Sequence, residues 1–306
     1  MIIQDVVIIG SGAAGSTAAF HLAKEGRNVI LLEKNEKGYI KPCGGGISSS
    51  TQQLFPFDLK PIIEEVINKV HFTWNLEDEV IANLPGSSPF WIVKREKFDE
   101  LIISKAISAG AKLIQPFFVR SVNKEDSIWK IKSAEGITLL AKSIIIADGS
   151  YSPWPSLFKL GPTYKHKAKT TSIRLSERGN IERGVARFDF GLVRNGFTWA
   201  FPINEGVNIG VGTFIGNNSI DNEKVLKSFL ISLGLNPDTS KRTNQSLNVW
   251  NGHHKLHGEG LLIVGDAASL CDPFLAEGLR PALISGYEAA KCLNKWLLLE
   301  SKDLQE

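Results

Sequence analysis

Three glycines near the N-terminus have a spacing that could bind a phosphate-bearing cofactor. Four apolar β-formers, Val-Val-Ile-Ile, precede Gly10, Gly12 and Gly15. In a G-x-G-x-x-G pattern the first glycine permits a tight turn and the second lets the backbone approach a pyrophosphate. The third lets the following helix pack on the strand. Amides at the positive end of that helix, which include those of Ala13 and Ala14, would then bind the anion.

An acidic residue stands where such a unit binds a ribose. The helix expected over Ala13–Lys24 is followed by a strand over Asn28–Leu32, which ends at Glu33 and Lys34. A carboxylate about twenty residues beyond the glycines accepts from a ribose hydroxyl. An acid here favours an unphosphorylated adenosine ribose, as in FAD or NAD, over NADP. The alternative is an ordinary βαβ unit with a glycine turn.

A second glycine-rich stretch, Gly38–Ser50, contains Cys43 followed by Gly44, Gly45 and Gly46. Three consecutive glycines are costly to order, so we expect neither a helix nor a regular strand here. A loop of this kind approaches something flat or bulky, or it moves. The alternative for its cysteine is a small buried hydrophobic side chain.

Composition excludes several classes of protein. The chain has 306 residues, a formal net charge of +3 and 43% hydrophobic residues, as a soluble globular protein has. There is no nucleic-acid-binding fingerprint and no apolar run long enough to span a membrane, which leaves a peripheral membrane contact open. Cys43, Cys271 and Cys292 form neither a disulfide framework nor a metal motif, and the N-terminus lacks a signal-peptide pattern, so we expect a cytoplasmic protein.

Two further clusters of charged or titratable residues have unremarkable interpretations. The basic segment Lys165–Arg187 is interpreted as a solvated face, with a site for an anionic headgroup or diphosphate as the alternative. His253, His254 and His257 lack a carboxylate or cysteine partner at ligand spacing, so no metal site is predicted.

The elements that must position these residues are spread along the whole chain. Apolar strands expected at Val6–Ile9, Ser143–Ile146 and Gly260–Val264 each read as buried on both faces. They can share one sheet only if the nucleotide-binding domain is discontinuous and an antiparallel domain is inserted into it. We therefore predict an α/β fold, with residues 1–48, 93–153 and 255–306 in a Rossmann-like domain and residues 49–92 and 154–254 in a substrate domain.

Periodicity and turn signals predict the remaining elements. Helices are expected at Pro61–Lys69, Arg95–Gly110, Ile220–Leu233 and Gly278–Leu299. Strands are expected at Val70–Trp74, Glu79–Ala82, Trp91–Val93, Ala111–Gln115, Phe117–Val122, Ile128–Lys132, Ile137–Ala141, Ile181–Phe190, Gly196–Phe201 and Val207–Phe214.

Set side by side, these segments resemble the geranylgeranyl reductase family, within the flavoproteins that share the p-hydroxybenzoate hydroxylase fold. The resemblance covers almost the whole chain. Its four ordered motifs are the glycine pattern with Glu33, Pro42-Cys43-Gly44-Gly45-Gly46, Phe197-Thr198-Trp199-Ala200-Phe201-Pro202, and Gly265-Asp266-Ala267-Ala268 continuing to Glu277-Gly278-Leu279. Arg95-x-x-Phe98-Asp99 and Ala147-Asp148-Gly149 are shared more widely among these flavoproteins.

The resemblance implies a set of FAD contacts. Asp266, after Gly265, would accept from ribityl hydroxyls, with a helix N-cap as its alternative. The amides of Gly278 and Leu279 would face the flavin edge that becomes negative on reduction. The remaining contacts that it implies are Cys43 and Gly44 beside the ring, Arg95, and Asp148 and Gly149 in a turn near the pyrophosphate. The alternative for Arg95 is an i,i+4 ion pair with Asp99. The alternative for Asp148 and Gly149 is a purely structural turn.

The same resemblance implies catalytic positions. Cys43, with Gly44 and Gly45, would line the flavin and substrate cavity and assist proton delivery or substrate placement. Trp199 and Phe201 alternate with small residues, so both rings point to one face of a strand. They form either a core face or the wall of a tunnel for an isoprenoid tail.

The implied activity is FAD-dependent reduction of double bonds in a geranylgeranyl-type isoprenoid chain, by hydride from reduced flavin coupled to protonation. NADPH or ferredoxin would be a transient electron donor. The alternatives are a flavin monooxygenase or halogenase on the same fold, and a non-catalytic flavin- or isoprenoid-binding protein. Only ten residues follow Trp296, so we expect an open cavity, a smaller substrate, or a partner or membrane that completes the cavity.

Overall fold

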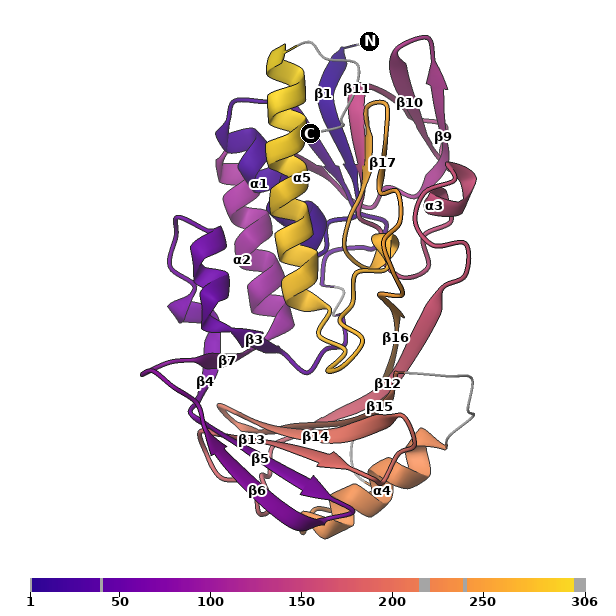
Figure 1. The fold of residues 1–306 in the computed structure, drawn as a ribbon. Coiled ribbons are helices and arrows are strands. Elements are labelled where there is room, and N and C mark those ends of the chain that lie inside the picture. Colours follow the sequence, from indigo (N-terminus) through magenta and orange to yellow (C-terminus); the bar gives the residue numbers. More distant parts are fainter. Residues whose placement is uncertain (1, 39–40, 215–220, 239–240, 300–306) are drawn as a thin grey trace.

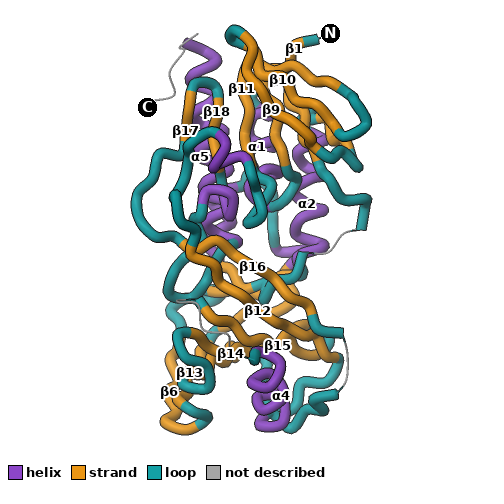
Figure 2. The backbone as a smooth tube through the Cα atoms, turned by 90° about the vertical axis from the view of Figure 1, so that its right-hand side faces the viewer, coloured by secondary structure: helices purple, strands orange, loops and turns teal. Residues whose placement is uncertain are grey.

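Two large β-sheets form the two ends of the molecule in the computed structural model (Figure 1), which describes residues 2–38, 41–214, 221–238 and 241–299. One sheet has eight strands and the other seven, and a three-stranded sheet lies between them on the side of the long helices. The chain passes between the two ends several times, as the tube in Figure 2 shows. Residues far apart in sequence therefore meet where the two ends face each other.

The eight-stranded sheet has a parallel centre in which three distant apolar strands are neighbours. Its order is β17-β18-β11-β1-β2-β8, with β10 and β9 paired to the side of β11. Ile8 of β1 lies opposite Ile145 of β11 and Leu31 of β2. This confirms that the apolar strands come together from across the chain. The strands of this sheet are β1 (Ile3–Ile9), β2 (Val29–Leu32), β8 (Lys112–Ile114), β9 (Val119–Glu125), β10 (Ile128–Ser133), β11 (Thr138–Ile146), β17 (His257–Gly258) and β18 (Leu261–Ile263).

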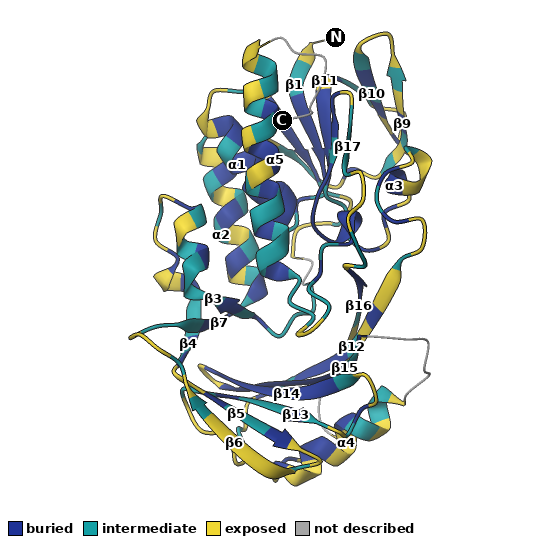
Figure 3. Ribbon diagram, in the orientation of Figure 1, coloured by how far each residue is buried: buried dark blue, intermediate teal, exposed yellow. Residues whose placement is uncertain are grey.

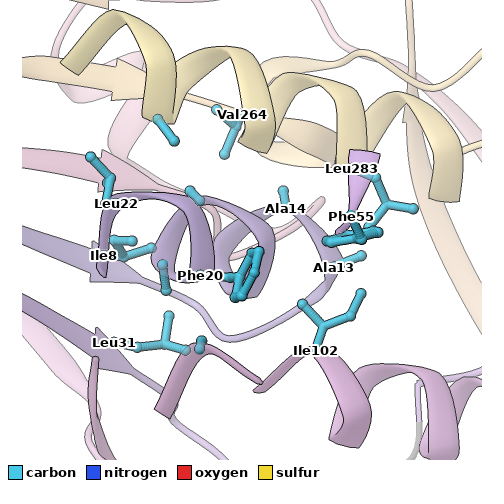
Figure 4. Packing of buried hydrophobic residues seen from close by; sticks show 14 of the residues in the cluster. Ile8, Ala13, Ala14, Phe20, Leu22, Leu31, Phe55, Ile102, Val264 and Leu283 are labelled. Carbon is cyan, nitrogen blue, oxygen red and sulfur yellow. The ribbon is translucent and has the colours of Figure 1, made fainter. Parts of the chain in front are cut away.

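Both faces of this sheet are buried, which explains its continuous apolar runs. Val6 and Ile8 belong to a core shared with the helices, whereas Val7 and Ile9 belong to a separate core on the opposite face. Figure 3 shows the central strands of this sheet as buried, and Figure 4 shows Ile8 near Phe20 of α1 and its neighbours. The alternation of side chains along β1 thus fills two cores from one strand.

Three helices cover one face of the sheet: α1 (Ala13–Lys24), α2 (Arg95–Ser108) and α5 (Leu279–Leu299). The contact of α1 with α5 is so close that a Cβ on Gly286 would stand 2.2 Å from the carbonyl oxygen of Ala14. A Cβ on Gly15 would stand 1.9 Å from the carbonyl oxygen of Gly10. Gly286 therefore permits the close packing of α5 on α1, and Gly15 permits the close packing of α1 on the turn that follows β1.

The seven-stranded sheet has the order β16-β12-β15-β14-β13-β5-β6. Helix α4 (Asn222–Ser232) packs on the face that points away from the other sheet, where it forms a core with the interior of β12, β14 and β15. The opposite face is rich in aromatic rings. The strands are β5 (Lys69–Trp74), β6 (Glu77–Asn83), β12 (His166–Leu175), β13 (Val185–Phe190), β14 (Gly196–Ile203), β15 (Gly206–Thr213) and β16 (Thr243–Val249).

The three-stranded sheet links the two ends. Its order is β3-β7-β4, formed by Gly46–Ser48, Phe90–Val93 and Ile63–Ile67. A short helix α3 (Trp154–Leu157) and 3-10 turns at Ser49–Leu54, Lys60–Ile62 and Gly265–Ala268 complete the fold. None of the described helices is long and apolar enough to cross a membrane.

Several expectations about individual elements were wrong. Pro61–Lys69 is not a helix: a 3-10 turn ends at Ile62, and β4 continues as a strand because it pairs with β7. Ile137–Ala141 and Ser143–Ile146 are one continuous strand, β11, rather than two.

Two further corrections concern the seven-stranded sheet. The basic segment Lys165–Arg187 is not simply a solvated face, because it contains the long strand β12, whose Ile173 and Ala168 are buried. Strand β13 begins at Val185 rather than at Ile181. The predicted start of a helix at Ile220 lies outside the described residues.

Candidate functional site

A cavity of about 410 Å³ lies between the two large sheets. Four parts of the chain surround it: the start of α1, the Cys43 loop, the aromatic face of the seven-stranded sheet and the segment that leads into α5. Of the predicted site residues, the structure places the following on its wall: Gly12, Ala13, Ala14, Cys43, Gly44, Gly45, Arg95, Gly149, Trp199, Phe201, Gly265, Asp266, Gly278 and Leu279.

The start of α1 has the geometry of an anion site. No side chain caps its first turn and no acidic residue lies in it. A Cβ on Gly12 would meet nothing within 4 Å, and the φ of Gly12, −65°, is one that any residue can adopt. The protein's own packing therefore does not require glycine here, whereas close approach of a pyrophosphate does. Gly10 does have a packing reason, since its φ is +103° and a Cβ would stand 2.5 Å from the carbonyl oxygen of Ala147.

The carboxylate of Glu33 is held in place beside this turn. Its Oε2 accepts from the hydroxyl of Ser11 at 2.8 Å and from the backbone amide of Ser11 at 3.2 Å. Its Oε1 accepts from the backbone and side-chain amides of Asn35 at 2.9 and 2.7 Å. Neither Glu33 nor the exposed Lys34 lines the cavity itself; they lie at the end of β2, beyond the glycine turn.

Asp148 and Gly149 follow β11 at the same edge of the sheet. Burial raises the pKa of the Asp148 carboxyl above its usual value, against smaller opposing effects that include the charge of Lys34. Gly149 has φ +88° and lines the cavity. Asp148 is not on the cavity wall, which favours a supporting position in the turn over direct contact with a ligand.

On the α5 side, Asp266 projects to the cavity from the 3-10 turn after β18. It is 7% exposed, and its Oδ2 lies 3.2 Å from Nζ of Lys41. Its side chain therefore pairs with a lysine instead of capping a helix. Gly278 lies directly before α5, and its Cβ position is 3.5 Å from Oδ1 of Asp266, so the helix start and the carboxylate face the same space.

The Cys43 loop crosses the cavity next to β7. The backbone amide of Gly45 donates to Sγ of Cys43 at 3.3 Å, and the buried guanidinium of Arg95 lies near this thiol. Gly45 has φ +83°, and a Cβ there would stand 2.2 Å from the carbonyl oxygen of Val93. A short strand, β3, begins directly after it at Gly46, which the glycine content had argued against.

Arg95 makes the ion pair that was the alternative to a cofactor contact. Its Nη2 lies 2.8 Å from Oδ2 of Asp99, four residues later on α2. Burial alone would lower the pKa of Arg95, but Asp99 and Cys43 raise it above the usual value. Unlike a surface pair, this one has its guanidinium 6% exposed and on the cavity wall, so Arg95 is a fixed positive charge at the site.

The remaining wall is a continuous layer of aromatic rings. Trp199 and Phe201 of β14 face the cavity, as the alternation predicted, while Ala200 belongs to the core on the α4 side. Across the sheet, Gly210 of β15 lies opposite Trp199, and a Cβ there would stand 2.1 Å from its Cζ2. Five more rings line this side of the cavity: Phe72, Phe90, Phe188, Phe197 and Phe214. Together with Trp199 and Phe201 they form what we call the aromatic wall.

Sequence reasoning missed two residues on the cavity wall, Lys41 and Glu277, and one residue bonded to that wall, Asn208. Lys41 pairs with Asp266, and Asn208 bonds both Cys43 and Trp199. Glu277 lines the cavity, and its buried Oε1 has no hydrogen-bond partner among the described residues. Burial, and the charge of Asp272, raise the pKa of this carboxyl, although Arg280 lowers it. Glu277 stood in a recognised motif, whereas nothing local marked Lys41 or Asn208.

Comparison with known proteins agrees with this arrangement. Residues 5–55 match the family model described as an FAD binding domain. The chain is 30% identical to the digeranylgeranylglycerophospholipid reductase of Thermoplasma volcanium, over 98% of this chain and 79% of that protein. The chain belongs to the geranylgeranyl reductase family.

Solved structures extend the comparison for this family member. The geranylgeranyl bacteriochlorophyll reductase-like protein of Thermoplasma acidophilum matches with a TM-score of 0.88 and 25% identity, over 97% of this chain and 79% of that one. The myxobacterial chondrochloren halogenase matches with a TM-score of 0.77 and 18% identity, over 98% and 76%. The second likeness is one of fold alone.

These findings identify the chain as an FAD-dependent oxidoreductase. The site fits the cofactor on its own chemistry. An uncapped helix start next to Gly12 suits the pyrophosphate, and the oriented carboxylate of Glu33 suits the adenosine ribose. The start of α5 and Asp266 line the same cavity as Gly12.

Proposed function

We propose that this protein reduces carbon–carbon double bonds in an isoprenoid chain of the geranylgeranyl type, with FAD as cofactor. The observation that carries the proposal is that one cavity joins the dinucleotide-binding turn at Gly12 to an aromatic wall containing Trp199 and Phe201. The relatives named digeranylgeranylglycerophospholipid reductases support a prenyl lipid as the substrate class.

We assign the residues that would hold FAD on the same grounds. The domain that binds it would comprise residues 1–48, 93–153 and 255–306, with residues 49–92 and 154–254 reserved for substrate. The pyrophosphate and adenosine side would be held by Gly10, Gly12, Ala13, Ala14, Gly15, Glu33 and Lys34. The flavin side would be held by Cys43, Gly44, Arg95, Gly265, Asp266, Gly278 and Leu279. Asp148 and Gly149 would form a turn near the pyrophosphate, in which Asp148 supports Gly149.

The chemistry requires a hydride equivalent and a proton, since an isolated alkene is not polarised. FAD supplies the hydride when it is bound in its reduced form. The protein's contribution is to hold the chain in place, exclude water and deliver the proton to the second alkene carbon. The aromatic wall, apolar and almost without hydrogen-bonding groups, suits the first two tasks.

Cys43 is our candidate for proton delivery or substrate placement. Its thiol accepts from the amide of Gly45 and lies on the cavity wall near the positive charge of Arg95. Glycine at position 44 lets the loop pack closely against Phe201, since a Cβ there would stand 3.2 Å from Cε2 of that ring. Trp199 and Phe201 would grip the chain beside the thiol.

Electrons must reach the flavin from outside. We assign NADPH or a ferredoxin-type protein as a transient donor, because the chain has one dinucleotide motif and FAD occupies it. A peripheral contact with a membrane surface would bring a lipid substrate to the cavity.

The test begins with purified protein carrying FAD under anaerobic conditions. After photoreduction, addition of geranylgeraniol or geranylgeranyl diphosphate should reoxidise the flavin, and mass spectrometry should find products heavier by two hydrogen atoms per reduced bond. Cys43→Ala and Cys43→Ser should slow this reoxidation while FAD stays bound. Flavin that reoxidises only with oxygen, with oxygenated or halogenated product, would instead support a monooxygenase or halogenase. Binding of the prenyl compound without reoxidation would identify a non-catalytic protein.

A further inference from the structure

One buried amide connects the aromatic wall to the Cys43 loop. Asn208 of β15 is 2% exposed, and its Nδ2 donates to the carbonyl oxygen of Cys43 at 3.0 Å. Its Oδ1 accepts from the indole Nε1 of Trp199 at 3.3 Å. The Asn208 side chain therefore uses both its donor and its acceptor. Its bond to Cys43 joins residues 165 positions apart in sequence.

The sheet register explains how Asn208 reaches the loop. It lies opposite Phe201 on one side and Arg174 on the other, so its side chain points to the face that carries the aromatic wall. The indole of Trp199 lies over Gly210, two residues further along β15. Because Gly210 has no side chain, the indole can lie flat enough across β15 for its N–H to meet the Asn208 amide.

The other side of the loop is held independently. The backbone amide of Val93 donates to the carbonyl oxygen of Gly45 at 2.9 Å, and the guanidinium of Arg95 on α2 lies near the thiol of Cys43. These contacts come from β7 and α2, whereas Asn208 comes from the seven-stranded sheet. Cys43 is thus anchored from both ends of the molecule, and Asn208 supplies the anchor on the substrate side.

We propose that Asn208 is a positioning residue that fixes the Cys43 loop and the Trp199 ring relative to each other. The proposal deepens the proposed function and rests on it, because the distance from thiol to ring decides which atoms of a bound chain face the thiol. Asparagine is suited to this task since it offers a donor to the carbonyl and an acceptor to the indole from one rigid amide. Aspartate would keep the acceptor and lose the donor, and leucine would lose both.

The first measurement is independent of turnover. The alkylation rate of Cys43 by iodoacetamide is followed by peptide mass spectrometry in the FAD-loaded protein, with half-buried Cys292 as internal reference. Asn208→Asp and Asn208→Leu should raise the rate at Cys43 at least fivefold, because the loop loses its anchor, with the rate at Cys292 changed less than twofold. Trp199→Phe, which removes the indole N–H and leaves Asn208 in place, should raise it by about twofold.

The matched control is Thr198→Val. Thr198 is a fully buried residue on the same strand as Trp199, and its hydroxyl has no hydrogen-bond partner among the described residues. This variant should leave the alkylation rate within twofold of wild type. Unchanged Cys43 alkylation in both Asn208 variants, or an equal rise in Thr198→Val, would overturn the proposal.

The second measurement concerns catalysis. Asn208→Asp should lower kcat for prenyl reduction at least tenfold while the Kd for FAD changes less than twofold, and it should alter which double bonds are reduced first. A loss confined to FAD affinity would contradict positioning. If wild type reduces no prenyl compound, the proposed function fails, yet the alkylation result still decides whether Asn208 anchors the loop.

Discussion

The hydroxyl of Ser11 donates to Oε2 of Glu33 over 2.8 Å, across the glycine turn that separates β1 from α1. With the two amides of Asn35 on Oε1, this bond fixes the plane of the Glu33 carboxylate before any ligand arrives. A carboxylate oriented in this way loses little conformational entropy on accepting a ribose hydroxyl. The glycine motif therefore includes a side chain, that of Ser11, which the spacing of its glycines does not specify.

We expect Glu33→Gln to raise the Kd for FAD about tenfold, equivalent to about 1.4 kcal/mol, since a charge-assisted acceptor is lost. Ser11→Ala should raise it only about threefold, because Asn35 still holds the carboxylate. Titration of apoprotein with FAD, followed by flavin fluorescence, measures both values. Exposed Glu36 provides the control, and Glu36→Gln should bind FAD as wild type does. Equal affinities for Glu33→Gln and Glu36→Gln would remove Glu33 from the site.

The ion pair between Lys41 and Asp266 places a positive charge on the cavity wall near the start of α5. Because a nearby positive charge stabilises the reduced, more negative flavin, Lys41→Gln should make the reduction potential of bound FAD more negative by about 30 mV. Redox titration against a reference dye measures the shift. Exposed Lys37→Gln is the matched control and should leave the potential unchanged. A potential that stays the same in Lys41→Gln would place the lysine too far from the ring to act on it.

The length of chain that the cavity accepts should depend on Gly210. A Cβ there would stand 2.1 Å from Cζ2 of Trp199, so Gly210→Ala must push the indole into the cavity. We expect kcat/KM to fall about tenfold for a geranylgeranyl substrate and less for a geranyl one, with FAD still bound.

The control for this change is Gly258→Ala, whose Cβ would meet only Leu261 Cβ at 4.0 Å. This variant should leave the ratio of the kcat/KM values for the geranylgeranyl and geranyl substrates as it is in wild type. If Gly210→Ala lowers kcat/KM equally for both substrates, the indole does not limit the length of chain that the cavity accepts.

The β1–α1–β2 unit was predictable because its signals are local. The glycines, the apolar run and the acidic residue occur within about thirty positions, and α1 begins and ends at Ala13 and Lys24 as expected. The same holds for α2, which begins at Arg95 and ends two residues before Gly110. That β11 and β18 share a sheet with β1 also followed from the sequence, since all three strands read as buried on both faces.

The rest of the fold depends on pairing that local patterns do not contain. Strand β12 is rich in Lys, Thr, Ser and Arg, a composition typical of a solvated segment, yet β15 and β16 flank it on both sides. The helix expected at Pro61–Lys69 failed for the same reason, because pairing with β7 outweighs helix propensity in so short a segment.

The candidate site divides in the same way. Motifs identified the residues whose chemistry is visible at short range, such as Cys43 and Asp266. Lys41 and Asn208 carry no such signal, since each acts on a partner more than 150 positions away. Their roles follow only from the way the two large sheets face each other.

Acid stability should depend on His21 of α1, whose ring contacts Tyr287 of α5. Its ring packs edge-on against Tyr287 at 4.7 Å and stacks on Phe55 at 5.9 Å, and its Nε2 has no hydrogen-bond partner among the described residues. Burial, with a contribution from Lys24, lowers the pKa of His21 below its ordinary value of 6.5, although Glu25 opposes this. The native state therefore binds fewer protons than the unfolded state around pH 6.

The sign of the effect follows from linkage. A histidine with a depressed native pKa contributes stability that is fully present above its ordinary pKa of 6.5 and is lost as the pH falls through the native value. His21→Gln removes this proton uptake, so its Tm should fall less than that of wild type between about pH 7 and pH 5, by about 2 °C. Differential scanning calorimetry at several pH values measures the difference. His166→Gln, at an exposed histidine, should retain the wild-type pH dependence; if it flattens the curve as much as His21→Gln does, burial of His21 is not the cause.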